Sequence, residues 1–334
     1  MSYELAIDFG SSAIRIAAKN KGVLANEPAV VAINKKDGKM LGAGLRAKAM
    51  TDRAHSGIAV IWPISGGRIH DILAAQLLVR SILDTAAKPH IKKPSVLISL
   101  PCAATEMEKK ALFNTALAAG AKRVAFIPSP VAAALGNGIN ITNATARTIV
   151  DIGAQTTEIA VVTQGTVAVY DEIFCAGNVF DKKIADYMRA KYGLLIGRPT
   201  AEMLKLSAGC IEARTTEVFF DVKGRSLYTG LPTIVRISSN EIPAVLEKPA
   251  VLLSDAIRDL LDCAPAQLKP DIAQYGVLLT GGSTGLYGFN TWIENKCQCK
   301  TALSEDAKDC GINGLLKALT QQDTLIKAGI ISEQ

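Results

Sequence analysis

The sequence has few of the residues that mark several common classes of protein. Only 5% of its 334 residues are aromatic, and only three are histidine. No stretch is long and apolar enough to span a membrane. The amino-terminal residues run directly into a strand pattern, so no signal peptide is expected before it. We therefore expect a cytoplasmic protein, with attachment to a membrane surface left open as an addition.

Blocks of like charge are also missing. The net charge of +6 is spread in pairs such as Lys92-Lys93 and Lys122-Arg123. Scattered charge is typical of solvated faces, so no nucleic-acid partner is expected. Hydrophobic residues make up 49% of the chain and charged residues 20%, which indicates a globular protein long enough for two domains.

The seven cysteines do not form a recognisable metal motif. An odd number of cysteines in a cytoplasmic chain favours free thiols. Cys297 and Cys299, with Cys310 as a third ligand, leave zinc open as an alternative. The spacing is not Cys-x-x-Cys and no second pair follows, so we favour ordinary buried or surface thiols.

Three short glycine-containing stretches each accompany an apolar run. They are Asp8-Phe9-Gly10-Ser11-Ser12, Asp151-Ile152-Gly153-Ala154-Gln155-Thr156-Thr157 and Leu279-Thr280-Gly281-Gly282-Ser283. A strand that ends in aspartate and turns on glycine and hydroxyl residues presents backbone N–H groups to an anion, with a carboxylate beside them for a cation. Two copies of the aspartate form predict two similar lobes that face each other across a nucleotide and its metal. The chain lacks GxxxxGK[ST], which excludes a P-loop site.

Strand and capping patterns predict the elements around these loops. A β-β-β unit is expected twice, with its strands at 3–9 and 13–19 in the first half and at 147–152, 157–163 and 166–173 in the second. Thr105 and Glu108 form a capping box for a helix to Ala119, and Ser129 is expected as an N-cap with Pro130 at N1.

Later helices and two insertions are predicted in the same way. Helices are expected over 179–192 with Asn178 as N-cap, over 200–206 and over 240–261. Segments 34–62 and 178–249 interrupt the pattern and are interpreted as insertions. The second insertion should contain a hairpin over 221–237 that turns at Lys223-Gly224.

With these motifs in this order, the chain resembles the MreB group of bacterial actin-like proteins, within the fold shared by actin, Hsp70 and sugar kinases. The resemblance runs nearly end to end and also includes residues 26–33, 63–69, 101–108, 130–136, 176–181 and 200–205. It implies an α/β, two-lobed actin-like fold of two duplicated β-β-β-α-β-α (RNase H-like) domains, each with a small inserted subdomain. The implied bounds are 1–33, 63–145 and 316–334 for subdomain IA, 34–62 for IB, 146–177 and 250–315 for IIA, and 178–249 for IIB.

The resemblance also implies a function. Proteins of the group bind ATP, polymerise into filaments, line the inner face of the membrane and guide cell-wall synthesis in rod-shaped cells. The expected cofactors are ATP or ADP with Mg²⁺. The expected partners are further copies of the chain, the membrane and membrane-bound cell-wall proteins.

The resemblance assigns roles to residues of the three loops and of two neighbouring segments. Asp8 and Asp151 would lie near the metal, mainly through its waters. Glu202 and Lys205 share one face of a helix and would reach the ribose and adenine, although a solvent-exposed salt bridge is the alternative. The cofactor-binding set is Gly10, Ser11, Ser12, Gly153, Thr156, Thr157, Gly177, Glu202, Lys205, Gly281, Gly282 and Ser283.

The sequence departs from the family pattern where hydrolysis takes place. The position before Pro130 carries Ser129 instead of the usual glutamate, and Ala154 and Gln155 replace two glycines of the second loop. A side chain there would crowd the γ-phosphate, or strain the turn if φ is positive. We favour slow or absent ATP hydrolysis. In the alternative, Gln155 positions the attacking water from the second loop, and Thr156 could still orient it.

Two other functions remain as alternatives. One is a nucleotide-dependent adaptor of the same fold that does not polymerise. The less favoured one is a small-molecule kinase, because no catalytic aspartate stands out beyond Asp8 and Asp151. For membrane contact, the basic loop at 87–93 is weighed equally as a lipid-binding loop and as a solvated loop.

Overall fold

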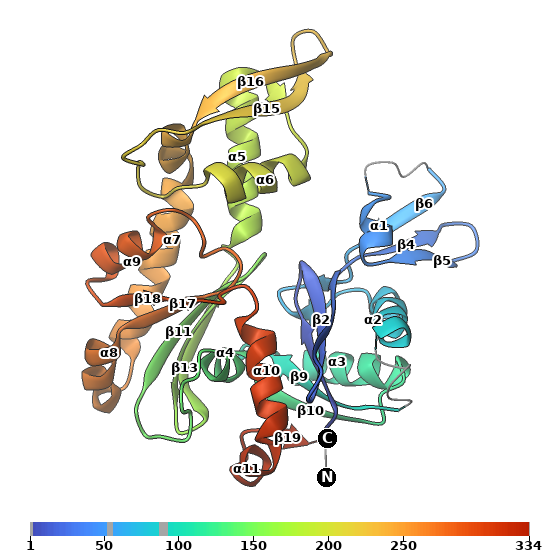
Figure 1. Cartoon of the computed structure of the whole chain (residues 1–334), viewed down its shortest axis with the longest axis vertical. Helices are drawn as coiled ribbons and strands as arrows, with labels where there is room; N and C mark the ends of the chain where they lie inside the picture. Colours follow the sequence, from blue (N-terminus) through green and yellow to red (C-terminus); the bar gives the residue numbers. More distant parts are fainter. Residues whose placement is uncertain (1–2, 52–55, 87–92, 334) are drawn as a thin grey trace. The chain divides into compact units, whose positions relative to one another are not determined.

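The computed structural model describes residues 3–51, 56–86 and 93–333. The chain divides into two compact units (Figure 1). Unit 1 comprises Met1–Ala146, Val161–Tyr170 and Asp309–Gln334, and unit 2 comprises Arg147–Ala160 and Asp171–Lys308. Each unit is built on one main sheet, as the duplicated strand pattern predicts. The four subdomain bounds implied by the resemblance stay a prediction.

Unit 1 is centred on a six-stranded sheet in the order β19-β10-β9-β1-β2-β3. β1 pairs antiparallel with β2 and parallel with β9, and β10 continues the parallel part. The first β-β-β unit is therefore confirmed. The strands of this sheet are β1 (Leu5–Phe9), β2 (Ala13–Ala18), β3 (Gly22–Pro28), β9 (Ser95–Leu100), β10 (Arg123–Pro128) and β19 (Ser332–Glu333).

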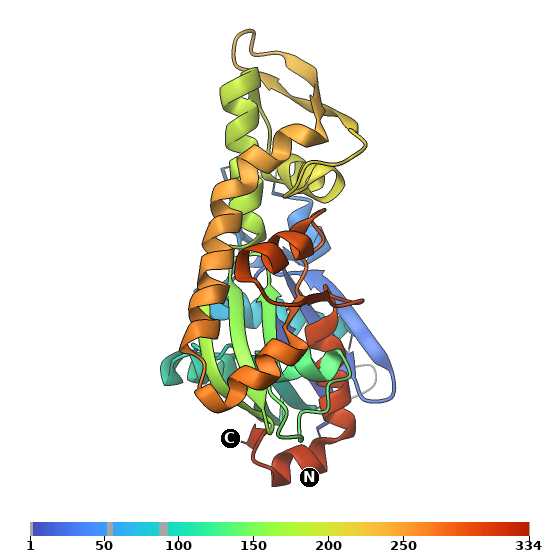
Figure 2. The ribbon, with the colours of Figure 1, turned by 90° about the vertical axis from the view of Figure 1, so that its left-hand side faces the viewer.

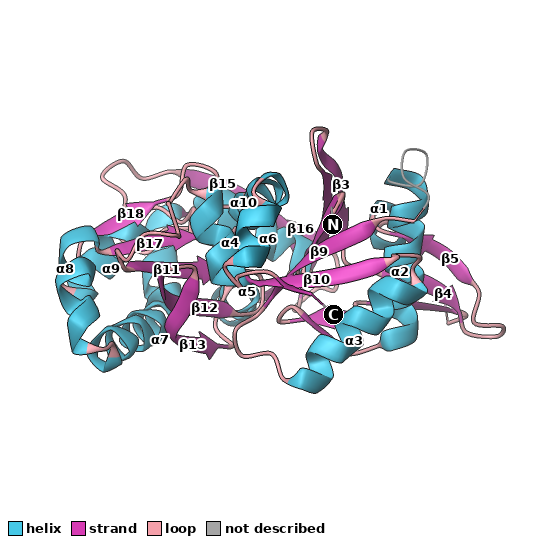
Figure 3. Cartoon of the chain, turned by 90° about the horizontal axis from the view of Figure 1, so that it is seen from below, coloured by secondary structure: helices cyan, strands magenta, loops and turns pink. Residues whose placement is uncertain are grey.

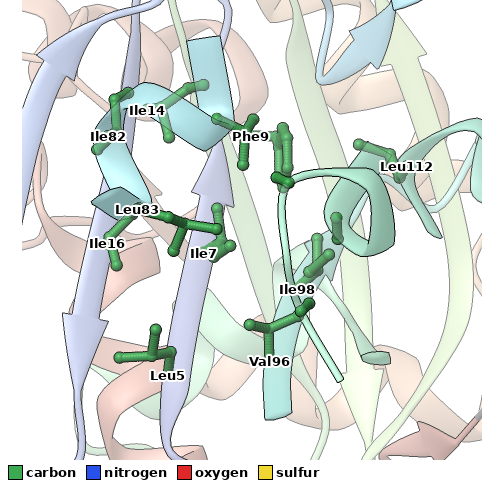
Figure 4. Close-up of a cluster of buried hydrophobic side chains, with 14 of the residues drawn as sticks. Leu5, Ile7, Phe9, Ile14, Ile16, Ile82, Leu83, Val96, Ile98 and Leu112 are labelled. Atoms are coloured by element: carbon green, nitrogen blue, oxygen red, sulfur yellow. The ribbon is translucent and has the colours of Figure 1, made fainter. Parts of the chain in front are cut away.

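Helices pack on both faces of this sheet (Figure 3). On one face, α2 (Ile72–Ala86) and α3 (Glu106–Ala118) cover a core of alternate strand residues that includes Leu5, Ile7 and Phe9 (Figure 4). Because successive side chains of a strand point to opposite faces, Asp8 points to the other face. That face is covered by α10 (Cys310–Thr320), beside α4 (Ser129–Gly136).

Two glycines bring α4 and α10 almost into backbone contact. A Cβ on Gly314 would lie 1.6 Å from the carbonyl oxygen of Ala132, and one on Gly136 would lie 2.1 Å from that of Cys310. No larger residue fits either position without moving a helix. The short helix α11 (Gln322–Lys327) follows α10, and Gln322 Oε1 accepts a hydrogen bond from Tyr3 N, which ties the two ends of the chain together.

Smaller elements complete unit 1. A three-stranded sheet has the order β5-β4-β6, and β7 pairs with β8. These elements are β4 (Val31–Asn34), β5 (Met40–Ala43), α1 (Leu45–Lys48), β6 (Ile58–Ile61), β7 (Ile64–Ser65) and β8 (Arg68–Ile69).

The main sheet of unit 2 has the order β13-β12-β11-β17-β18. β11, β17 and β18 are parallel neighbours, whereas β12 and β13 carry the second β-β-β unit and continue into residues assigned to unit 1. The second repeat is thereby confirmed. The strands are β11 (Arg147–Ile152), β12 (Thr157–Thr163), β13 (Thr166–Ile173), β17 (Val277–Thr280) and β18 (Thr301–Leu303).

Long helices connect this sheet to a small sheet in the order β14-β15-β16. In two views, α5 and α7 run side by side along unit 2 (Figures 1 and 2). The elements are α5 (Gly177–Tyr192), β14 (Leu194–Leu195), α6 (Arg198–Ala208), β15 (Phe219–Ser226), β16 (Pro232–Ser238), η1 (Ser239–Glu241), α7 (Ile242–Cys263), η2 (Ala266–Leu268), α8 (Lys269–Tyr275) and α9 (Phe289–Cys297). Among the described residues, none of the helices combines the length and apolar character that crossing a membrane needs.

The structure confirms one predicted cap and corrects two others. The capping box of Thr105 with Glu108 is present. Ser129 is not an N-cap, because β10 runs to Pro128 and the helix begins at once with Ser129, which places Pro130 one position deeper. The cap of α5 is Ala176 rather than Asn178.

The predicted turn at Lys223-Gly224 is wrong. Both residues lie inside β15, where Gly224 pairs with Thr233, and the hairpin turns between Ser226 and Pro232. A Cβ on Gly224 would lie 2.5 Å from the carbonyl oxygen of Leu195 in the neighbouring strand β14. The glycine therefore permits a close approach of backbone within the sheet, which its sequence context does not distinguish from a turn.

Candidate functional site

The second aspartate-glycine loop lies at the carboxyl end of β11. Gly153 N donates to Thr156 O at 3.0 Å, which closes the turn. The carbonyl oxygen of Gly153 accepts two hydrogen bonds, from Ser283 Oγ at 2.7 Å and from Gly177 N at 3.2 Å. This single oxygen thus joins the loop to the segment after β17 and to the first residue of α5.

The two residues that replace glycines fit this loop without left-handed backbone. Among the described residues that are not glycine, only Asn20, Gln164 and Gln298 have positive φ. Ala154 and Gln155 are therefore in ordinary conformations, and the strain expected for a positive φ does not arise. Ala154 O also accepts a hydrogen bond from Asn178 N at 2.7 Å, so the backbone amide of Asn178, not a side-chain cap, holds the loop.

Three polar groups surround Gly177. A Cβ at this position would lie 2.5 Å from Ser283 Oγ, 3.0 Å from Lys205 Nζ and 3.4 Å from Gly153 O. Lys205 Nζ donates to Gly177 O at 3.3 Å and lies 3.0 Å from Asp181 Oδ1, with the side chains of this ion pair 6% and 5% exposed. Burial raises the pKa of Asp181, and the adjacent ammonium of Lys205 opposes that rise.

The loop after β17 depends on one glycine. Gly281 has φ +93°, and a Cβ there would lie 2.3 Å from Asp151 Oδ1 and 2.4 Å from Ile152 O. Its N–H donates to Ala307 O at 2.8 Å. Gly282 is different, because its φ is not positive and a Cβ would meet only Lys308 Cγ at 3.7 Å. Gly281, Ser283 and Asp151 are thus gathered at the carboxyl ends of two neighbouring parallel strands.

The first aspartate-glycine loop, in unit 1, is organised by charge. Asp8 and Arg15 stand directly opposite each other in the β1-β2 hairpin. Arg15 Nη1 lies 3.1 Å from Asp8 Oδ2, and Arg15 Nε lies 3.3 Å from Asp309 Oδ1 at the start of α10. Ser99 Oγ donates to the other Asp8 oxygen, Oδ1, at 3.1 Å.

The turn of this hairpin is held by its own chain. A Cβ on Gly10 would lie 2.6 Å from the carbonyl oxygen of Ala13, so only glycine fits. Ser11 Oγ accepts a hydrogen bond from Gly67 N at 3.4 Å, and Ser12 O accepts one from Ala29 N at 3.0 Å. The side chain of Ser11 therefore has a structural role as an acceptor, while its O–H and the backbone amides of the turn stay available as donors to a ligand.

The two predicted metal-side carboxylates lie in different surroundings. Both oxygens of Asp8 accept hydrogen bonds from donors of unit 1, one of them a guanidinium, which weakens the attraction of this carboxylate for a cation. A role of Asp8 beside Mg²⁺ stays a prediction. Asp151 is half-buried at the carboxyl end of β11, and its Oδ1 faces Gly281. Among the described residues, no group of three or more histidine, cysteine, aspartate or glutamate side chains could hold a metal ion.

Several predicted residues lie away from these contacts. Thr157 is fully buried, and its Oγ1 donates to Cys175 O at 2.6 Å, so its hydroxyl is engaged inside unit 2. Ser129 belongs to unit 1, whereas Gln155 and Thr156 belong to unit 2. Glu202 is half-buried on α6 and does not form the predicted alternative salt bridge with Lys205, because Lys205 pairs with Asp181 on α5.

The cysteines do not gather around the Cys297 and Cys299 pair. Cys310 belongs to unit 1, where its Sγ donates to Ala133 O at 3.1 Å. All seven cysteines lie within the described residues, and none of them forms a disulfide. A hydrogen bond between the Cys297 and Cys299 thiols, together with burial, raises the pKa of Cys297.

Sequence reasoning missed Arg15, Ser99 and Asp309. A signal for Arg15 was available, because a charged residue between Ile14 and Ile16 in an apolar strand needs a partner. A four-residue loop over 10–13, which pairs Phe9 with Ile14, places residue 15 opposite residue 8. Ser99 and Asp309 come from distant parts of the chain, and no local pattern indicates them.

Comparisons with known proteins agree with this architecture. The family model described as "MreB/Mbl protein" matches residues 2–327. The "Cell shape-determining protein Mbl" of Bacillus cereus is 32% identical over 328 residues, which is 98% of each chain.

Solved structures give the same result. MreB5 of Spiroplasma citri bound to AMPPNP has a TM-score of 0.92 at 32% identity and covers 98% of this chain and 99% of its own. The same protein has also been solved bound to ADP. The MamK double helical filament, 20% identical with a TM-score of 0.79 over 95% of this chain and 98% of its own, shows likeness of fold alone. With the family model over almost the whole chain and the actin-like fold of two duplicated units, this protein belongs to the MreB/Mbl family.

Proposed function

We propose that this chain binds ATP and ADP and assembles into filaments that determine cell shape. The observation that carries nucleotide binding is the junction in unit 2, where Gly153, Gly177, Gly281 and Ser283 bring three backbone segments together. Two of these segments follow the carboxyl ends of parallel neighbours β11 and β17, the edge at which open α/β sheets bind ligands. The S. citri relative, 32% identical, binds AMPPNP and ADP.

The backbone of both aspartate-glycine loops supplies the donors in this proposal. Gly10, Ser11 and Ser12 in unit 1 and Thr156 in unit 2 would donate N–H groups to phosphate oxygens, since a phosphate is recognised well by backbone amides. Gly153 would act by shaping the second loop, because its own N–H is bonded to Thr156 O. Glu202, Gly281 and Gly282 would contact the adenosine. Lys205 would act by holding Gly177 in place through its bond to the carbonyl oxygen.

Mg²⁺ would accompany the phosphates, held mainly by their oxygens and by water, with Asp151 as the protein carboxylate beside it. The cation would supply charge neutralisation. Asp8 would contribute less to this role, because its oxygens accept hydrogen bonds from Arg15 and Ser99.

Hydrolysis is proposed to be slow. Ser129 lacks the carboxylate or amide that would orient a water, and a short hydroxyl in the first turn of α4 cannot replace its reach. Ala154 and Gln155 have ordinary backbone conformations, so strain in the second loop is not a reason to expect slow hydrolysis. The proposal rests on the missing water-orienting group at position 129. Gln155 is the residue to test as a substitute.

Filament formation and attachment to the inner face of a membrane extend the proposal. The family membership and the name of the B. cereus relative support a cell-shape role. The basic loop weighed for lipid contact lies, apart from Lys93, outside the described residues. Membrane-bound cell-wall proteins would be the partners of the filament.

One experiment tests these points together. The full chain is sedimented at high speed in ATP, ADP and AMPPNP, with and without anionic vesicles, while phosphate release is followed in the same tubes and pellets are imaged by electron microscopy. Filaments in ATP and AMPPNP with little phosphate released would support the proposal. A lack of filaments under every condition would favour the adaptor, and rapid phosphate release would contradict slow hydrolysis.

The Gln155→Ala variant separates the two accounts of hydrolysis. If Gln155 positions water, the variant loses the remaining phosphate release while it still binds nucleotide. Unchanged phosphate release would leave the simple loss of the water-orienting residue as the explanation. Thr163→Ala, a change on β12 outside the loop, serves as the matched control.

A further inference from the structure

Arg15 is a cation that the fold itself places on the first loop. The β1-β2 hairpin sets it opposite Asp8, on the face of the sheet that α10 covers. Its side chain is only 14% exposed, and a buried guanidinium persists only with partners. A surface arginine that meets a carboxylate by chance would be more exposed and less constrained.

The partners of Arg15 are two carboxylates. Nη1 lies 3.1 Å from Asp8 Oδ2 and Nε lies 3.3 Å from Asp309 Oδ1, while Ser99 Oγ holds the remaining oxygen of Asp8. The Asp8 side chain is 22% exposed and that of Asp309 47%. The Asp309 oxygen that faces Arg15 is itself buried, so the guanidinium lies between two carboxylates. Only its contact with Asp8 has hydrogen-bond geometry, so Asp8 is the carboxylate that Arg15 holds directly.

A polyphosphate bound at this loop would interact with the charges of the side chains around it. An uncompensated Asp8 carboxylate would repel phosphate oxygens bound at the amides of Gly10, Ser11 and Ser12, and a divalent cation would be needed to offset that repulsion. In this chain the guanidinium of Arg15 offsets the charge of the Asp8 carboxylate permanently. Its pairing with Asp8 also occupies the oxygen that a hydrated cation would approach.

We propose that Arg15 is a fixed countercation for the first loop, which makes nucleotide binding by this chain only weakly dependent on Mg²⁺. The inference rests on the proposed nucleotide binding and adds to it a residue that sets the cation requirement. Arg15 acts through Asp8 and is therefore a positioning residue.

The test measures binding, not hydrolysis. Anisotropy of a fluorescent N-methylanthraniloyl derivative of AMPPNP gives Kd for the full chain in excess Mg²⁺ and in EDTA. For the unaltered chain, the two values should agree within about threefold. For Arg15→Leu, Kd in EDTA should rise by roughly tenfold or more, because Asp8 is left unpaired, and Mg²⁺ should reverse most of that loss.

A double-mutant cycle shows whether Arg15 acts through Asp8. When Asp8→Asn removes the carboxylate charge, adding Arg15→Leu should no longer create a dependence on Mg²⁺. Arg15→Lys keeps the charge without the forked geometry and should lie between the two. It also carries the test if Arg15→Leu does not fold, as judged by thermal melting.

Arg123→Leu is the matched control. Arg123 is a half-buried arginine of the same sheet, at the first residue of β10, where its Nε donates to Ser95 Oγ at 3.3 Å. Its loss should alter stability without changing the ratio of the two Kd values.

The outcomes separate this inference from the proposed function. If the unaltered chain binds no nucleotide in either buffer, the proposed function fails and the role of Arg15 fails with it. If the chain binds nucleotide but needs Mg²⁺ strongly, or if Arg15→Leu leaves the ratio unchanged, nucleotide binding stands and Arg15 is only a structural ion-pair residue.

Discussion

The two aspartate-glycine loops begin from the same strand pattern but are stabilised by different interactions. In unit 1, Asp8 is held by a guanidinium and a hydroxyl. In unit 2, Asp151 lies against Gly281, and the loop is held by close backbone packing at Gly153 and Gly177. The residue seven positions after each aspartate also differs in charge, since it is the cation Arg15 in the first loop and the anion Glu158 in the second. A duplicated fold thus preserves the turn while its electrostatic surroundings change.

The largest expected effect tests the dependence of unit 2 on glycine. Gly281→Ala forces a Cβ into left-handed backbone beside Asp151 and Ile152, and we expect a loss of about 4 kcal/mol in the free energy of unfolding. Gly282→Ala is the matched control, because its Cβ would make only an ordinary contact with Lys308 Cγ, and it should change stability by less than about 0.5 kcal/mol. Denaturant titration of both variants measures the difference. Equal losses would show that the conformation of Gly281 is not the constraint.

The next effect concerns the buried ion pair beneath Gly177. Lys205→Met leaves Asp181 without its cation at 5% side-chain exposure, and we expect a loss of about 3 kcal/mol near neutral pH. Burial raises the folded-state pKa of Asp181, so its protonated form is favoured in the folded protein. The contribution of Asp181 to the free energy of unfolding is therefore largest below the pKa that this carboxyl has in the unfolded chain. It is lost as pH rises through the higher pKa of the folded protein.

The loss caused by Lys205→Met should accordingly shrink at acidic pH, where Asp181 is protonated. Urea titrations of the variant and the parent chain at several pH values give this dependence. Adding Asp181→Asn should restore part of the stability near neutral pH. A loss that is independent of pH and of residue 181 would mean that the effect comes from packing alone.

Two serines compare the loops directly. Ser99→Ala removes a donor to a carboxylate and should cost about 2 kcal/mol, whereas Ser283→Ala removes a donor to the Gly153 carbonyl and should cost about 1 kcal/mol. Thermal or chemical unfolding of both variants measures the order. The reverse order would contradict the view that charge dominates the first loop and neutral packing the second.

The smallest effect lies at the far end of unit 2. Burial alone would raise the pKa of Glu241, but hydrogen bonds from Lys191, the Ser238 amide, Tyr187 and Tyr192 lower it to about 2. A lowered carboxyl pKa gives stability that is present above the unfolded value and is lost as pH falls from about 4.5 through about 2. Glu241→Gln should reduce this acid dependence, which unfolding curves between those values would show. This pH dependence is opposite in sign to that of Asp181.

Local signals predicted much of the fold, because strand alternation and the Thr105 capping box act over a few residues. The same locality explains the errors. Gly224 resembles a turn residue in sequence, and only the neighbouring strand β14 shows that it serves a close backbone approach. The loops were predicted from their composition, whereas the pairing of Lys205 with Asp181 depends on how α5 and α6 pack. Long-range partners of this kind carry no short-range pattern.

The crossing of α4 and α10 has a consequence for the order in which the protein can fold during synthesis. Unit 1 begins with the first strand of the chain, yet Gly136 in α4 needs Cys310 against it, and the sheet edge at β10 needs Ser332 and Glu333. Most of unit 2, by contrast, is one continuous run, Asp171–Lys308. A nascent chain therefore holds an unfinished unit 1, with the α10-covered face of its sheet exposed, until α10 and β19 have been made. A chaperone that binds exposed apolar surface would be needed most during that interval.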